Sequence, residues 1–209
     1  MIFRLTDALV FPDPALAEDD GLLAIGGDLS SERLELAYCS GIFPWFSEDD
    51  LILWYSPDPR FVLYPQEIKV SKSMRKVLSQ SLFHYTKNEA FDAVIEACAE
   101  TERPGQSGTW ITEGMKAAYK KLHRKGLAHS YEVWQNGVLS GGFYGVKTGD
   151  IFCGESMFSR VPNASKAALI ELCRNESYPL IDCQVHTDHL ESMGARFISR
   201  TAYLDHLNP

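Results

Sequence analysis

The stretch IFCGESMFS (151–159) decides the fold, because it sets one carboxylate, Glu155, inside an apolar run typical of a buried strand. The helix-like segment VPNASKAALIELCRN (161–175) and a second short apolar strand, PLIDCQV (179–185), follow it. An ionised carboxylate is expensive to bury without a partner. Glu155 is therefore expected to have a specific role that the strand alone does not explain.

The segments around this pair give a regular order of elements. A helix over 109–126 is followed by three antiparallel strands, and the dipeptide Asn136-Gly137 between the first two is the strongest short signal for a tight hairpin. After the second apolar strand, a helix stopped by Gly194 and a final strand over 195–204 are expected. Helix caps are predicted at Ser30 or Ser31, Thr112 and Asn163.

The order helix, three strands, helix, strand, helix, strand is that of the acyltransferase fold of GNAT-type N-acetyltransferases, a mixed α/β (α+β) fold. In that fold, the strands before and after the long helix run parallel, splay apart at one end and accept an acyl donor in the gap. The first part of the chain is irregular and turn-rich. We therefore expect a small N-terminal domain over 1–62 and a GNAT-like acyltransferase domain over 63–209. Such an analogy does not by itself give function.

Side-chain alternation groups polar residues on the two central strands. Asp182 and Gln184 are two residues apart, so they share one face of their strand and lie about 7 Å apart. Glu155 lies on the neighbouring strand of the expected pair, so the three side chains can converge in one cleft. The pattern leaves two interpretations open: a catalytic centre, or a self-satisfied polar network that only fixes the core.

The connection SRVPNASK (159–166) bears on the identity of the acyl donor. Enzymes that use acetyl-CoA cradle its pyrophosphate in a glycine-rich turn before the long helix, and this connection holds no glycine. Backbone amides at a helix start can still hold an anion, but the usual loop is missing. The donor is therefore not expected to be a CoA thioester.

The charge is unevenly distributed. The formal net charge is −8, and acidic residues concentrate in residues 1–50, so the rest of the chain is close to neutral. Two basic clusters, KVSKSMRK (69–76) and KAAYKKLHRK (116–125), are either solvated helix faces or a local footprint for phosphates. Under the second interpretation, the candidate phosphate contacts are Lys72, Arg75, Lys76, Lys116, Lys120, Lys121 and Arg124.

Composition indicates the cellular compartment and the kinds of site that are expected. The sequence contains no run of about 18 apolar residues, so no membrane span is predicted. The N-terminus lacks the pattern of a signal peptide. The cysteines are odd in number and show no CxxC spacing, so we expect reduced thiols, no metal and a cytoplasmic protein. The cysteines are Cys39, Cys98, Cys153, Cys173 and Cys183.

Motifs spread over residues 21–195 resemble the leucyl/phenylalanyl-tRNA–protein transferases, the bacterial aminoacyltransferases of the N-degron pathway. The matching runs are GLLAIGGDLS, GIFPWFS, WYSPDPR, GTWIT, HSYEVW, GGFYGV, FCGESMFS, NASKAAL, LIDCQV and DHLESMGA. GESMFS and IDCQ in this order and spacing are highly specific. The short connection CRNESYP (173–179), which lacks a glycine-bearing loop, and the early C-terminus depart from the family without touching a motif.

The resemblance implies transfer of Leu or Phe from Leu-tRNA or Phe-tRNA to the N-terminal Arg or Lys of acceptor proteins. It implies no cofactor, because the ester is already activated. It places Glu155, Asp182 and Gln184 at the catalytic centre, and Trp45 and Trp110 near the 3′-terminal adenosine of the tRNA. For each tryptophan, the alternative is simple core or interface packing.

The residues support a division of roles. We expect Glu155 to hold the cationic acceptor terminus, Gln184 to orient the attacking amine, and Asp182 to orient Gln184. Ser156 and nearby backbone amides are candidates for stabilising the oxyanion. An apolar pocket for the Leu or Phe side chain is expected from Phe143, Phe152, Met157, Leu169 and Ile181.

Two other functions stay open from the residues. One is an acyl-CoA-dependent N-acetyltransferase on the same fold, which the missing loop disfavours. The other is a non-catalytic module that binds peptide or tRNA, which the three polar residues disfavour. No long exposed apolar stripe is evident in the pattern, so a monomer is expected.

Overall fold

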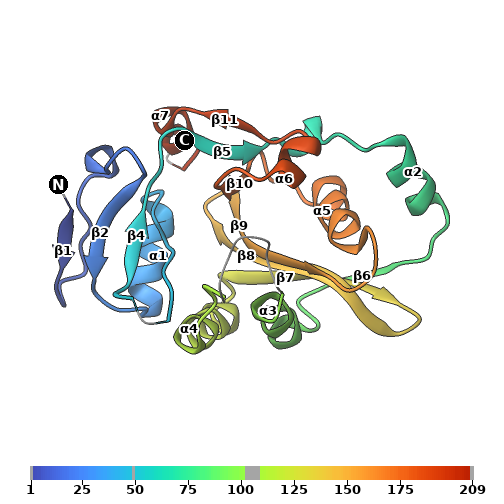
Figure 1. Ribbon diagram of the computed structural model, residues 1–209, viewed down its shortest axis with the longest axis horizontal. Helices are drawn as coiled ribbons and strands as arrows, with labels where there is room; N and C mark the ends of the chain where they lie inside the picture. The colour runs from blue at the N-terminus through green and yellow to red at the C-terminus, as the bar shows by residue number, and fades with distance from the viewer. Residues whose placement is uncertain (1, 49, 102–108, 208–209) are drawn as a thin grey trace.

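The computed structural model describes residues 2–48, 50–101 and 109–207, which form two β-sheets and their covering helices (Figure 1). The loop expected over 102–108 lies outside the described residues. The smaller sheet has the order β1-β2-β4-β3 and is covered by α1. Its elements are β1 (Phe3–Leu5), η1 (Pro14–Leu16), β2 (Leu22–Gly26), α1 (Ser31–Cys39), β3 (Phe43–Pro44) and β4 (Leu53–Tyr55).

The larger sheet has seven strands in the order β11-β5-β10-β9-β8-β7-β6. The strands are β5 (Arg60–Leu63), β6 (His84–Lys87), β7 (Ala128–Gln135), β8 (Val138–Thr148), β9 (Ile151–Ser159), β10 (Ile181–Gln184) and β11 (Arg196–Ile198). Its helices are η2 (Pro65–Glu67), α2 (Lys72–Ser79), α3 (Phe91–Ala99), α4 (Glu113–Arg124), α5 (Ala164–Asn175), α6 (Asp188–Ser192) and α7 (Arg200–Leu207).

Two apolar cores flank the larger sheet, one on each face. Helices α3 and α4 cover one face and α5 covers the other (Figure 1). The first core contains Tyr119 and Cys153 and continues into the smaller sheet and α1. The second contains Phe143, Phe152 and Leu169. An opening between strands of this sheet would therefore connect the core on the α3 and α4 face with the core on the α5 face.

Local sequence signals explain several of these elements. Asn136 and Gly137 adopt φ values of 53° and 76°, the paired left-handed conformation that a tight β-hairpin requires. The Oγ1 atom of Thr112 accepts a hydrogen bond from the backbone N–H of Met115 at 3.2 Å, which caps α4 as predicted. Ser30 likewise caps α1 through the N–H of Arg33.

The parallel pair that the fold prediction depended on is present. Strands β9 and β10 run parallel with only two register pairs, Phe152 with Ile181 and Cys153 with Asp182. Beyond them Gln184 has φ of 62°, which is outside extended backbone, so the two strands part. The mixed α/β fold with a splayed central pair is thus confirmed.

A second irregularity lies on the other side of β9. Tyr144 of β8 is opposite Ser156, whereas the next residue, Gly145, is opposite Gly154. Glu155 is therefore the extra residue of a β-bulge. Bulges redirect a side chain and increase the local twist, and this one occurs beside the point where β9 and β10 separate.

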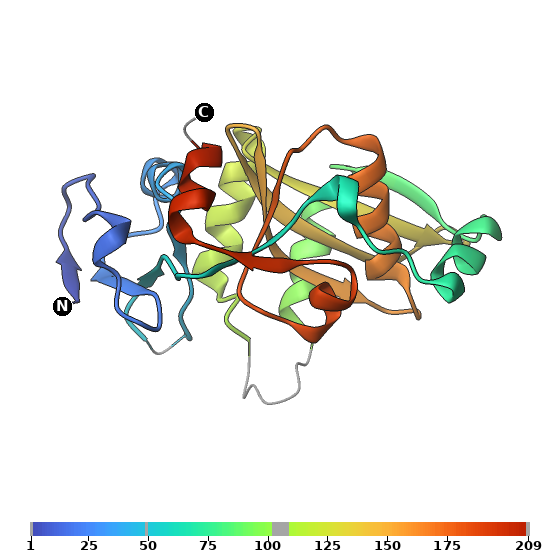
Figure 2. The ribbon, with the colours of Figure 1, turned by 90° about the horizontal axis from the view of Figure 1, so that it is seen from above.

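The C-terminal part of the chain differs from the sequence prediction. The prediction of a final strand over 195–204 is wrong, because only β11 is extended and α7 begins at Arg200. Ser199 starts this helix, since its Oγ accepts the N–H of Ala202 at 3.2 Å. Helix α7 lies on the side of the larger sheet that faces the smaller one (Figure 2), and its residues Tyr203 and Leu204 lie next to Gly41, just after α1. The C-terminal helix α7 therefore contacts the part of the chain that forms the smaller sheet.

Two smaller expectations also need adjustment. Asn163 occupies the position before α5, but it has φ of 71° and its side chain makes no capping hydrogen bond. Strand β5 begins at Arg60 and belongs to the larger sheet, inside the range expected for the N-terminal domain. The division at 62/63 stays a prediction. No helix among the described residues has the length and apolar character needed to cross a bilayer.

Gly145 provides a test of the bulge, because a Cβ there would collide with the backbone oxygen of Cys153 and the ring of Phe152. Gly145→Ala is expected to lower the free energy of unfolding by about 2 to 3 kcal/mol. Gly114→Ala is the control, since its Cβ would meet no atom closer than 3.6 Å and is expected to be neutral or stabilising by up to about 1 kcal/mol. Urea unfolding measures both, and equal effects would contradict the argument.

Candidate active site

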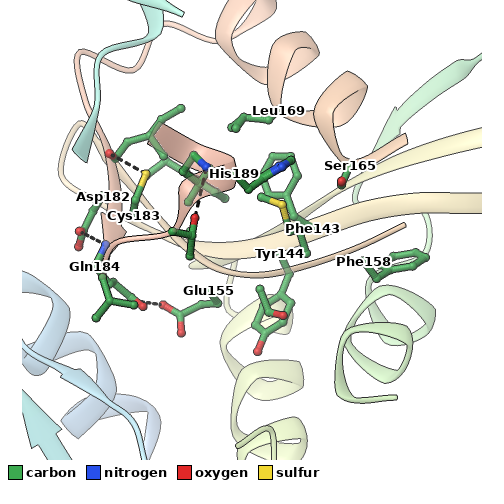
Figure 3. Close-up of a pocket in the computed structure, with 18 of the residues that line it drawn as sticks. Phe143, Tyr144, Glu155, Phe158, Ser165, Leu169, Asp182, Cys183, Gln184 and His189 are labelled. Atoms are coloured by element: carbon green, nitrogen blue, oxygen red, sulfur yellow. Dashed lines mark hydrogen bonds between the residues drawn. The ribbon is translucent and has the colours of Figure 1, made fainter. Parts of the chain in front are cut away.

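A cavity of about 470 Å³ opens where β9 and β10 separate (Figure 3). Its walls include Glu155, Ser156, Asp182 and Gln184. They also include every residue that the sequence predicted for an apolar pocket and both predicted tryptophans: Phe143, Phe152, Met157, Leu169, Ile181, Trp45 and Trp110. The structure therefore brings the predicted polar and apolar residues to one place.

Glu155 is partly buried and has three hydrogen-bond partners. The hydroxyl of Tyr38 lies 2.7 Å from Oε1 and that of Tyr119 lies 3.1 Å from Oε2. The Nε2 atom of Gln184 donates to Oε1 at 2.8 Å. Burial raises the pKa of Glu155 to about 7, and the charge of Asp182 adds to the increase. A carboxyl group that titrates near neutral pH is suited to proton transfer.

Gln184 owes its position to backbone geometry. Its left-handed conformation is stabilised because its N–H donates to Oδ1 of Asp182 at 2.9 Å. The side-chain NH₂ group faces Glu155, so the amide oxygen is the atom left to accept a hydrogen bond from a substrate. Asp182 therefore holds the backbone of Gln184 and does not contact its side-chain amide.

Asp182 itself forms a fully buried ion pair with Arg60. The guanidinium donates from Nε to Oδ1 at 2.9 Å and from Nη2 to Oδ2 at 2.6 Å, and the hydroxyl of Tyr203 also donates to Oδ2 at 2.9 Å. Arg60 is 1% exposed and Asp182 is 0% exposed. Burial alone would lower the pKa of Arg60, but the adjacent Asp182 raises it above its usual value, so the guanidinium stays charged.

Arg60 also joins distant parts of the chain. Its Nη1 donates to the backbone oxygen of Gly41 at 3.2 Å, just after α1. Its guanidinium lies 4.7 Å from the ring centroid of Phe43 and 4.5 Å from that of Tyr203. The smaller sheet, β10 and α7 therefore meet at one side chain.

Four residues of this site were not singled out from the sequence: Arg60, Tyr203, Tyr38 and Tyr119. Arg60 ends the run WYSPDPR, whose family match was the available signal. Tyr119 falls on the apolar stripe of its helix, where a tyrosine is ordinarily a core residue. Nothing in the local pattern distinguishes Tyr38 or Tyr203 from ordinary packed aromatics.

The basic clusters are less uniform than the sequence suggested. Lys116 contacts Glu96 and Glu113, each at 2.6 Å, and Lys120 contacts Glu96 at 2.8 Å. These two lysines are therefore largely neutralised. Lys121 and Arg124 lie exposed on the same helix. The remaining three candidates, Lys72, Arg75 and Lys76, are exposed on α2, at the far end of the molecule from the smaller sheet (Figure 1).

The start of α5 offers little to a pyrophosphate group. The N–H of Ala164 bonds the backbone oxygen of Val161, and that of Ser165 bonds Oγ of Ser159, both at 3.3 Å. Two of the first amides of the helix are thus already occupied. Within the described residues, one group of side chains has metal-ligand spacing, the exposed set His186, Asp188 and Glu191; His186 already bonds Glu191 at 3.0 Å.

A splayed parallel strand pair, with a titratable carboxyl and an amide at its opening and an apolar pocket behind them, defines an acyltransferase-type enzyme. Comparison with known proteins makes this specific. The model of the leucyl/phenylalanyl-tRNA protein transferase family matches residues 62–208, and that of its N-terminal domain matches residues 27–58. The chain belongs to the leucyl/phenylalanyl-tRNA protein transferase family.

Individual relatives agree with this assignment. Leucyl/phenylalanyl-tRNA–protein transferases from Syntrophobacter fumaroxidans and Flavobacterium johnsoniae are 56% and 52% identical over 206 residues. These alignments cover 97% of this chain, with 88% of the first relative and 97% of the second. A GCN5-related N-acetyltransferase from Kribbella flavida is a distant structural match, 9% identical with a TM-score of 0.38 over 77% of this chain and 58% of that one.

The buried ion pair of Arg60 and Asp182 is expected to contribute much more to the free energy of unfolding than an exposed salt bridge. Arg60→Ala leaves Asp182 buried and unpaired, so it is expected to lower the free energy of unfolding by about 3 to 5 kcal/mol. Lys87→Ala breaks a half-exposed pair with Glu176 at 2.6 Å and is expected to cost less than about 1 kcal/mol. Denaturant titration of both variants measures this. A loss below about 1 kcal/mol for Arg60→Ala would show that Asp182 does not depend on it.

Proposed function

We propose that this enzyme transfers Leu or Phe from aminoacyl-tRNA to the N-terminal Arg or Lys of acceptor proteins, which marks them for degradation. The observation that carries the proposal is the hydrogen-bonded pair of Glu155 and Gln184 at the opening of the apolar cavity. The names of the relatives supply the donor class. A cationic acceptor terminus suits the carboxyl group, and a leucyl or phenylalanyl side chain suits the cavity behind it.

The donor side chain is proposed to enter the pocket of Phe143, Phe152, Met157, Leu169 and Ile181. The two phenylalanine rings meet edge-to-face with centroids 5.9 Å apart, which fixes one wall. Side chains branched at Cβ are proposed to fit this wall poorly. Shape alone provides discrimination on the order of 1 to 3 kcal/mol, so Leu and Phe are favoured over Ile and Val without being the only substrates.

The 3′-terminal adenosine is proposed to stack on Trp45 and Trp110. Both indoles line the cavity, and Trp45 is supported by the ring of Tyr55 at a centroid distance of 5.8 Å. Stacking on an aromatic face requires no particular base sequence. Recognition of many charged tRNAs that share the same terminal nucleotide is therefore compatible with this arrangement.

The chemistry proposed is aminolysis of the aminoacyl ester. The amine nitrogen attacks the ester carbonyl, the C–N bond forms, the C–O bond to the ribose breaks, and one proton passes from nitrogen to the leaving oxygen. An α-amine has an unperturbed pKa of about 7.7 to 8.0, so part of it is neutral near pH 7. The amide oxygen of Gln184 aligns the amine, and Ser156 with adjacent amides is proposed to face the oxyanion.

Among the remaining alternatives, acetyl transfer from acyl-CoA is disfavoured by the occupied amides of Ala164 and Ser165 at the start of α5. A purely binding module is disfavoured because a carboxyl group with a raised pKa at the opening of a cavity is more typical of a catalytic site. We further propose that the enzyme acts as a monomer in the cytoplasm, where charged tRNAs are made.

Transfer measured in a single turnover tests the assignment of Glu155 and Gln184. Glu155→Ala and Gln184→Ala are each expected to reduce the rate of transfer from Leu-tRNA to an Arg-starting peptide by about 100-fold or more. Gln66→Ala, an exposed position on η2, is the control and is expected to retain the wild-type rate. Near-wild-type rates in both site variants would rule out the assignment.

A second test concerns the tRNA phosphates. The variant with Lys121→Ala and Arg124→Ala is expected to raise KM for tRNA, and to reduce the slope of log affinity against log salt by about 1 for each phosphate that is no longer neutralised. The variant with Lys116→Ala and Lys120→Ala is expected to do less, because Glu96 already balances those charges. An unchanged KM in the first variant would exclude α4 as a phosphate-binding surface.

A further inference from the structure

Three oxygen-bearing side chains form a closed triangle at the back of the site. Tyr38 from α1 and Tyr119 from α4 bond each other through their hydroxyls. Each also contacts Glu155, at 2.7 Å to Oε1 for Tyr38 and 3.1 Å to Oε2 for Tyr119. Both tyrosines are fully buried, at 2% and 0% exposure, so water does not complete the network from their side.

Counting protons shows which charge state of Glu155 fits this triangle. Three contacts need three hydrogen atoms, and two hydroxyl groups provide two. With Glu155 ionised, one contact must place two lone pairs face to face in a buried setting, which is costly. A proton on Oε2 removes the conflict: Glu155 donates to Tyr119, Tyr119 donates to Tyr38, and Tyr38 donates back to Oε1.

We propose that the resting enzyme carries a proton on Oε2 of Glu155, which the hydroxyls of Tyr38 and Tyr119 hold in a closed ring of hydrogen bonds. Gln184 is compatible with the ring, because its NH₂ group donates to Oε1, which remains an acceptor in the neutral acid. Tyr38 and Tyr119 are thus positioning residues. They set the pH at which Glu155 changes charge.

The other ionisable groups around Glu155 do not provide a counter-charge. Asp182 on β10 is negative, but Arg60 on β5 neutralises it through two hydrogen bonds. Burial raises the pKa of Cys153 on β9 and that of Tyr203 on α7, so both are neutral. Tyr144 on β8 packs against Tyr119. A pKa of Glu155 near 7 agrees with the proton count.

A neutral resting carboxyl has a consequence for catalysis that rests on the proposed function. Once its resting proton has passed to solvent, the ionised Glu155 can take a proton from the amine nitrogen as the C–N bond forms. It then holds this proton on Oε2 and gives it to the ribose oxygen as the C–O bond breaks. The carboxylate is thereby regenerated for the next turnover, and the ring provides a stable place for the proton between the two steps.

The protonation can be tested without any substrate. Infrared difference spectra of the full chain, recorded from about pH 5 to pH 9, are expected to show one buried carboxylic acid band that disappears with a midpoint near neutral pH. Glu155→Gln is expected to lack this band, which assigns it. Absence of a titrating buried acid from the wild-type spectra would overturn the proposal, whatever the outcome of the transfer assays.

The role of the hydroxyls is tested by Tyr38→Phe and Tyr119→Phe, each of which removes one oxygen atom. Each variant opens the ring that holds the proton and removes the contact that the ionised form leaves without a hydrogen atom, so the midpoint is expected to move to lower pH. A downward shift of about one unit raises transfer at pH 6.5 roughly threefold and leaves the rate at pH 9 nearly unchanged.

Tyr85→Phe, on the edge strand β6, is the matched control and is expected to leave both midpoint and rate unchanged. A structural role for the two tyrosines would instead reduce the rate equally at every pH. An unmoved midpoint in both variants, in proteins whose circular dichroism matches the wild type, would therefore overturn the assignment of Tyr38 and Tyr119. If the wild type transfers no aminoacyl group but the midpoints shift, the proton assignment stands and the proposed function fails.

Discussion

The buried pair of Arg60 and Asp182 is the interaction on which the rest of this site depends. Removing two charges from water costs several kcal/mol for each ion, and their attraction offsets this only when the geometry is good and the remaining atoms are bonded. Both conditions hold, since Tyr203 and the backbone oxygen of Gly41 complete the arrangement. The result is a fixed Asp182, which in turn holds the left-handed backbone of Gln184.

Much of the fold follows from patterns that are local in the chain. The asparagine-glycine turn, the cap at Thr112 and the apolar stripe of α4 each depend on neighbours a few residues away, so the sequence predicts them well. Strand alternation also grouped Asp182 and Gln184 with Glu155, although Gln184 reaches Glu155 from a left-handed backbone and not from an extended one. The apolar residues predicted beside them line the same cavity.

The parts that could not be predicted depend on contacts between distant segments. Arg60 and Asp182 are 122 positions apart, and Tyr38 and Glu155 are 117 apart. No periodic pattern encodes such pairs. The bulge at Glu155 depends on how β8 and β9 align. The prediction failed at α7 because RTAYL resembles a strand until Ser199 is seen to cap it.

The split between β9 and β10 explains how one cavity serves two chemical purposes. Phe143, Phe152 and Leu169 belong to the core on the α5 face, whereas Tyr38 and Tyr119 belong to the core on the α4 face. A continuous sheet would keep these environments apart. Because only two register pairs join the strands, the cavity at the opening is lined by residues of both faces. In the proposed reaction, residues on the apolar face select the donor side chain, and residues on the polar face bind and transfer the proton. A substitution on one face therefore need not disturb the function of the other.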